Sequence, residues 1–257
     1  MIKGLYTAAS GMMLQMARQD AVANNLANVN TSGFKKQTAV CRAFPEMLIS
    51  RLGETRETME GERIALKPQV VGGLGTGACI DAVYSDLSMG NLRRTDNPTD
   101  LALGTQGYYV VDTPEGIRYT RSSEYKINGE GYLTTREGYP LLDIYNEPVL
   151  LEDEFTVDKW GSIIINGEEL TRLQVVTFPN LQAMERLGDN LLSATEEPLP
   201  VEAPSILQGY VEDSNVSAVQ EMVTLITVVR AYETLQKMVQ AEDETLDVAL
   251  NEVGRVV

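Results

Sequence analysis

Apolar side chains near the start of the chain recur with helical spacing. From residue 5 to residue 26 they lie three or four positions apart, and only a glutamine at position 19 interrupts the apolar pattern. This spacing places one narrow stripe along a helix, as in coiled coils. The run ends in segment 28–33, whose Asn and Gly residues favour the turns that terminate helices. The stripe consists of Leu5, Ala9, Met12, Met16, Gln19, Ala23 and Leu26.

A second stripe with the same spacing lies near the end of the chain. Ser214 or Asn215 is a suitable N-cap, and neither glycine nor proline occurs between them and Gly254. The run predicts one helix of about 35 to 40 residues, longer than most helices of globular proteins. Such a helix favours partner helices, although a core helix of an ordinary domain would show a similar stripe. The stripe consists of Met222, Leu225, Val229, Tyr232, Gln236, Val239, Asp243, Leu246, Leu250 and Val253.

The middle of the chain has the pattern of an antiparallel β domain. Short runs rich in Tyr, Val, Ile and Thr alternate with Gly, Asn, Asp and Pro, which are the usual turn residues. The expected strands are 107–112, 116–120, 125–128, 131–135, 162–165 and 173–178.

These patterns together predict an α+β protein. We expect residues 1–40 and 205–257 to supply terminal helices that form a coiled-coil module. Residues 88–204 are expected to form the central antiparallel β domain. Residues 41–87 carry no clear periodicity and are expected to be a connector or extended arm.

The composition excludes several kinds of chemistry. The chain has 257 residues and no histidine, which excludes Ser-His-Asp and Cys-His catalysis and histidine-ligated metals. Its two cysteines, Cys41 and Cys79, cannot build a four-cysteine metal site, and free thiols are expected. No catalytic residue, cofactor or metal is therefore predicted.

Net charge and hydropathy limit the partners. The net charge of −16 argues against nucleic acid, and no apolar run is long enough to predict membrane insertion. We also expect no cleavable signal peptide, because Arg18 and Asp20 follow the first apolar run before any convincing cleavage site. Residues 1–36 carry four basic and one acidic side chain, whereas residues 209–257 carry three basic and nine acidic ones. Opposite charges of this kind suit pairing between the two terminal helices.

Alternatives to an assembly role remain open at this point. The run from Gly73 to Ala78 matches the G-x-G-x-x-A dinucleotide fingerprint and would suit an NAD-binding oxidoreductase. Turn residues follow it where a crossover helix should run, which weakens this interpretation. Another secreted coiled-coil or adhesin-like structural protein would share the two stripes.

Three ordered motifs resemble the bacterial flagellar rod and hook proteins. ANNLANVNTSGFKK at 23–36 is similar to their N-terminal signature, and GNLRRTDNPTDLAL at 90–103 is similar to their central motif. The third motif, similar to their C-terminal helix, begins with SNV at 214–216 and continues through Glu221-Met222-Val223 and Arg230-Ala231-Tyr232-Glu233; LQGYVE at 207–212 precedes it. The chain departs from the family at 105–109 and at 122–125, where an Asp-Gly pair is replaced. By its length the chain resembles a rod protein, proximal or distal, more than the longer hook protein.

The resemblance implies a structural subunit and not an enzyme. Rod proteins leave the cell through the flagellar type III export apparatus without a cleaved signal peptide, and they assemble helically into the hollow, torque-transmitting shaft of the basal body. The expected location is the periplasm or cell-wall zone, and the expected partners are copies of this chain and neighbouring rod and hook subunits.

The same resemblance suggests where subunits touch. We expect the two stripes to be buried mainly between subunits. Asn24, Asn25 and Asn28 either form the turn after the first helix or contact other subunits, and Arg230 is either solvated or paired across an interface. The predicted interface comprises Leu5, Ala9, Met12, Met16, Ala23, Asn24, Asn25, Leu26, Asn28, Met222, Leu225, Val229, Arg230, Tyr232, Val239 and Leu246.

Overall fold

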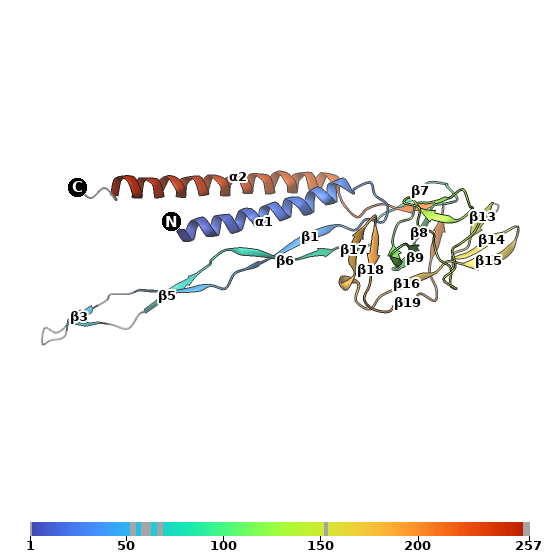
Figure 1. Cartoon of the computed structure of the whole chain (residues 1–257), viewed down its shortest axis with the longest axis horizontal. Helices are drawn as coiled ribbons and strands as arrows, with labels where there is room; N and C mark the ends of the chain where they lie inside the picture. Colours follow the sequence, from blue (N-terminus) through green and yellow to red (C-terminus); the bar gives the residue numbers. More distant parts are fainter. Residues whose placement is uncertain (1, 52–54, 58–62, 66–68, 152–153, 254–257) are drawn as a thin grey trace. The chain divides into compact units, whose positions relative to one another are not determined.

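The computed structural model describes residues 2–51, 55–57, 63–65, 69–151 and 154–253. The chain has a long helix near each end and antiparallel strands between them (Figure 1), so the predicted α+β class is confirmed. It divides into two compact units. One contains the described residues of Met1–Ala23, Thr38–Val83 and Met222–Val257, and the other contains Asn24–Gln37 and Tyr84–Glu221.

The two helices have the extents that the stripes predict to within a few residues. Helix α1 spans Ile2–Ala27, and helix α2 spans Ala218–Val248 and continues as a short π-helical segment, Ala249–Val253. Helix α2 begins after the expected cap because Asn215 is engaged elsewhere: its amide accepts a bond from Lys36 N and donates to Asp86 O. No helix in the described part of the chain is both long and apolar enough to cross a bilayer.

The described residues between Gln37 and Ser85 form three successive two-stranded antiparallel pairs (Figure 1). A connector or extended arm was expected at 41–87, without individual strands. The strands pair successively as β1 with β6, β2 with β5, and β3 with β4. Both faces of the β2–β5 pair are exposed, so the hydrophobic pattern that marks half-buried strands is absent. The strands are β1 (Gln37–Ala43), β2 (Met47–Arg51), β3 (Thr55–Glu57), β4 (Arg63–Ala65), β5 (Gln69–Leu74) and β6 (Ala78–Ser85).

The second unit is built from antiparallel strands. Its largest sheet has the order β17-β18-β10-β9-β16-β19, beside a three-stranded sheet β13-β14-β15 and the pairs β11-β12, β20-β8 and β21-β7. The strands are β7 (Leu92–Arg94), β8 (Leu101–Leu103), β9 (Tyr108–Thr113), β10 (Gly116–Thr120), β11 (Tyr125–Ile127), β12 (Leu133–Thr135), β13 (Phe155–Val157), β14 (Ser162–Ile165), β15 (Glu168–Arg172), β16 (Val175–Thr177), β17 (Glu185–Gly188), β18 (Leu191–Ser193), β19 (Leu199–Pro200), β20 (Ile206–Gln208) and β21 (Tyr210–Glu212), with a 3-10 turn, η1, at Leu181–Ala183.

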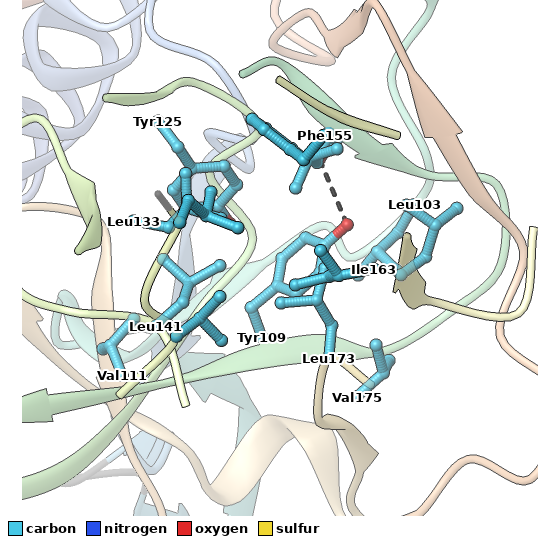
Figure 2. Packing of buried hydrophobic residues seen from close by; sticks show 14 of the residues in the cluster. Leu103, Tyr109, Val111, Tyr125, Leu133, Leu141, Phe155, Ile163, Leu173 and Val175 are labelled. Carbon is cyan, nitrogen blue, oxygen red and sulfur yellow. Dashed lines mark hydrogen bonds between the residues drawn. The ribbon is translucent and has the colours of Figure 1, made fainter. Parts of the chain in front are cut away.

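The core of this unit surrounds Tyr109. Figure 2 shows its ring among aliphatic side chains from several strands, and its hydroxyl donates a 3.2 Å bond to Leu101 O. The ring of Tyr125 meets it edge-on, with 5.6 Å between centroids. Burial raises the pKa of both hydroxyls, so both stay neutral at physiological pH.

Candidate assembly site

In the first unit, helix α1 packs against α2 through a row of small residues. A Cβ atom added to Gly11 would lie 3.1 Å from Leu235 Cδ1, and one added to Gly4 would lie 2.6 Å from Glu242 Oε1. Ala8, on the same side of the helix, is buried. Helices that lack large side chains at the contact can approach closely, so these residues set an antiparallel contact between α1 and α2.

The predicted stripe on α1 lies beside this contact row: its residues Leu5, Ala9 and Met12 each follow a residue of the row by one position. Leu5, Met12 and Leu26 are half-buried, whereas Ala9, Met16 and Ala23 are exposed. Met16 is 52% exposed, which is unusual for a helical residue in an apolar stripe. Two further exposed apolar residues on α1, Tyr6 and Met13, were not included in the prediction.

Helix α2 also keeps apolar side chains uncovered. Met222 and Arg230 are exposed, and the other predicted interface residues on this helix, Leu225, Val229, Tyr232, Val239 and Leu246, are half-buried. The prediction missed Val219, Val223 and Ile226, which are exposed together with Met222. These four residues have i, i+3, i+4, i+7 spacing, so they lie along one side of the helix and form the open α2 stripe.

The asparagines at the end of α1 shape the chain within the second unit. Asn25 is fully buried: its Nδ2 donates a 2.8 Å bond to Gln37 O, and its Oδ1 accepts one from Gln37 N. Asn28 Nδ2 donates to Asn24 O, and Asn28 Oδ1 accepts from Thr31 Oγ1. Asn28 thus makes its bonds in the turn after α1, Asn25 ties the end of the helix to the first residue of β1, and Asn24 is exposed.

Replacing Asn25 with alanine is expected to lower the free energy of unfolding by about 2 kcal/mol, because the backbone N–H and C=O of Gln37 lose their partner. Chemical denaturation measures this loss. Asn24→Ala, at an exposed neighbouring position, is the control and should change the stability little. Equal stability of the two variants would show that the bonds between Asn25 and Gln37 do not stabilise the fold.

A buried ion cluster includes Lys35, near the other end of segment 24–37. The Glu212 carboxylate accepts bonds from Lys35 Nζ at 2.5 Å, Arg121 Nε at 2.7 Å and Gly90 N at 2.9 Å. Glu212 is fully buried, and both cations are less than 10% exposed. Arg121 also donates to the carbonyl oxygens of residues 103, 105 and 107. A carboxylate buried to this extent is tolerated because its acceptor sites are filled by charged donors.

The pKa shifts reflect this environment. Burial alone would raise the pKa of Glu212, but the charges of Arg121 and Lys35 and the bond from Gly90 outweigh it and hold the pKa below its usual value. Burial lowers the pKa of Lys35, and Glu212 offsets part of that effect. A second, smaller pair lies nearby, in which Lys36 Nζ contacts the buried Glu221 carboxylate at 2.6 Å.

The ion cluster joins three distant parts of the chain in one unit. Lys35 follows α1, Arg121 follows β10, and Glu212 ends β21 just before α2. Gly33 N donates to Glu212 O. Residues 206–212, the closing segment before α2, pair with earlier strands as β20 with β8 and β21 with β7. Sequence reasoning did not single out these three charges. Lys35 lies in the motif at 23–36 and Glu212 in the one at 207–212, whereas Arg121 lies outside the motifs quoted above.

The dinucleotide fingerprint does not have the required setting. Gly73 lies in β5, Gly75 follows it, and Ala78 begins β6. The run therefore joins two strands, β5 and β6, whereas the fingerprint needs a strand followed by a helix whose N-terminus holds the pyrophosphate. Among the described residues, no group of three acidic or cysteine side chains is arranged to hold a metal ion.

The fold and these contacts define a class: an α+β subunit whose terminal helices carry open apolar stripes and whose β unit is held together by the segments that follow α1 and precede α2. Three family models match the chain. They are described as "Flagella basal body rod protein" (residues 5–35), "Flagellar hook protein FlgE/F/G D1 domain" (102–176) and "Flagellar basal body rod FlgEFG protein C-terminal" (207–252).

Full-length relatives agree with these matches. The chain is 34% identical over 277 aligned residues to the flagellar hook-basal body complex protein FlhO of Bacillus subtilis, with 100% of both chains covered. It is 33% identical to the basal-body rod protein FlgG of Caulobacter vibrioides, covering 95% of this chain and 97% of that one. The identity to FlgG of Borreliella burgdorferi is also 33%, with 98% of each covered. The chain belongs to the flagellar basal-body rod protein family.

Proposed function

We propose that this chain is a structural subunit of the flagellar basal-body rod, without enzymatic activity. The observation that carries the proposal is the pair of long terminal helices whose apolar stripes stay open, on a chain that matches rod proteins over its whole length. Family membership supports a location in the basal body and assembly with other rod and hook components.

We further propose that the open stripes of α1 and α2 pack against neighbouring copies as coiled-coil contacts in a hollow helical shaft. The α1–α2 contact within one chain uses Gly4, Ala8 and Gly11 and leaves Met16 and Met222 about half exposed. Exposed apolar rows of this kind are typical of surfaces that become buried on association. Packing along two long helices would give such a shaft the stiffness needed to transmit torque.

The proposal includes the route to the assembly site. The subunits would leave the cell through the flagellar type III export apparatus without a cleaved signal peptide, and they would assemble in the periplasm or cell-wall zone. Membership of the flagellar rod family supports this route.

Placing a charge on the open α2 stripe tests this function. Met222→Glu should abolish concentration-dependent assembly, because assembly would bury an unpaired carboxylate, and should leave the circular dichroism of the dilute chain unchanged. Sedimentation and electron microscopy measure assembly, and motility of a complemented deletion strain measures function. Thr227→Glu adds the same charge at an exposed position beside the stripe and should still assemble. Normal filaments from Met222→Glu would refute the interface.

A further inference from the structure

The buried ion cluster opens onto a small pocket in the β unit. The pocket has a volume of about 20 Å³, and its polar wall consists of Lys35, Arg121, Gln106 and Tyr108. The remaining wall is made by the backbone of Gly107 and by leucine and methionine side chains. A cavity of this size has room for one water-sized particle.

No acidic side chain lines this pocket, although Glu212 lies just behind its two cations. Arg186 adds a third positive charge close by, because its Nη2 donates a 2.9 Å bond to Lys35 O. Asp86 supplies a second negative charge that is close enough to act on Lys35. Three cations therefore face two carboxylates, a local positive excess in a chain of net charge −16.

Both lining cations have hydrogen-bonding capacity to spare. A lysine ammonium has three N–H groups, and two on Lys35 have partners in the described chain, Ser88 O and Glu212. Arg121 has five N–H groups, and four of them donate to Glu212 and to backbone carbonyls. Each cation thus keeps one N–H group without a partner among the described residues, although both side chains are buried, and a buried charge without full compensation is costly.

We propose that this pocket binds a small monovalent anion such as bromide or chloride. The anion would neutralise the local positive excess and accept the remaining N–H groups of Lys35 and Arg121. The apolar wall of the pocket favours weakly hydrated halides, while its small volume excludes larger organic anions.

Thermal unfolding of the full chain tests the site. Sodium bromide should raise the unfolding midpoint above that in sodium gluconate at equal ionic strength, by roughly 2–4 °C at ten times the dissociation constant. The effect should saturate, because one site is filled. Non-specific salt effects would not saturate, and they favour the more strongly hydrated anion.

Two variants separate the site from general salt effects. Gln106→Glu places a carboxylate at the exposed mouth of the pocket and should abolish the bromide effect, while Gln240→Glu on α2 adds the same charge elsewhere and should retain it. Crystals soaked in bromide should show an anomalous peak between Lys35 Nζ and the Arg121 guanidinium. An empty pocket in such crystals, no saturable bromide effect, or an unchanged effect in Gln106→Glu would each overturn the proposal.

Discussion

Replacing Glu212 with glutamine is expected to destabilise the β unit by about 3–5 kcal/mol, because it leaves the buried cations Lys35 and Arg121 without their shared counter-charge. The loss is large because all three groups are desolvated. Urea denaturation measures it, and the fluorescence of Trp160, the only tryptophan of the chain, reports the unfolding of this unit.

The lowered pKa of Glu212 also predicts part of the loss of stability in acid. Since the folded state lowers the pKa of Glu212, its stabilising contribution is present above the usual value of 4.5 and is lost as the pH falls through the lowered pKa. Glu212→Gln should therefore lose less stability than the parent chain below about pH 4.5. Glu202→Gln changes an exposed carboxylate in the same unit and is the control for both measurements. A Glu212→Gln chain as stable as Glu202→Gln would contradict the assigned role of the cluster.

A methyl group at Gly90 is expected to destabilise the β unit by about 3 kcal/mol or more. The added Cβ would lie 1.8 Å from Asp213 O, which is backbone and cannot swing aside like a flexible side chain. Relieving the clash would separate residues 90–91 from 212–213 and weaken two bonds, Gly90 N to Glu212 and Asp213 N to Asn91 O. Chemical denaturation of Gly90→Ala measures the loss.

Gly129 provides the matched control for this prediction. A Cβ there would meet no atom within 4 Å, so Gly129→Ala should change the free energy of unfolding by less than about 1 kcal/mol. If Gly90→Ala were as mild, the segment before α2 would have to shift without cost. That outcome would mean that the closing segment is held less tightly than its contacts indicate.

Much of the fold could be predicted because its signals are local. Strand β10 has the predicted bounds 116–120, β14 has the predicted bounds 162–165, and β9 is displaced by a single residue. Their runs of β-branched and aromatic residues lie between clear turn signals. The helices were predictable for a similar reason, since their apolar spacing is regular over many turns.

The remaining features depend on contacts that are distant in sequence. Periodicity identifies an apolar row, but it could not show that Gly4, Ala8 and Gly11 make the contact within the chain while Met16 stays exposed. Small residues contribute little to a hydrophobic pattern, although they allow the closest helix approach. The ion cluster was missed because isolated charges in a sequence are usually solvated, and only the fold brings Lys35 to Glu212.

The closing segment before α2 also determines when the β unit can finish folding. The bond from Lys35 to Glu212 joins residues 177 positions apart, and β20 and β21 pair with strands more than 100 positions earlier in the chain. Contacts between such distant residues form late, because the entropy of closing the loop must be overcome before they stabilise anything. A chain of which only the first 200 residues have emerged from a ribosome or a channel lacks β20, β21 and Glu212. Such a chain lacks Ile206 of the core and the carboxylate that neutralises Lys35 and Arg121, so the β unit cannot reach its final packing until Glu212 is free.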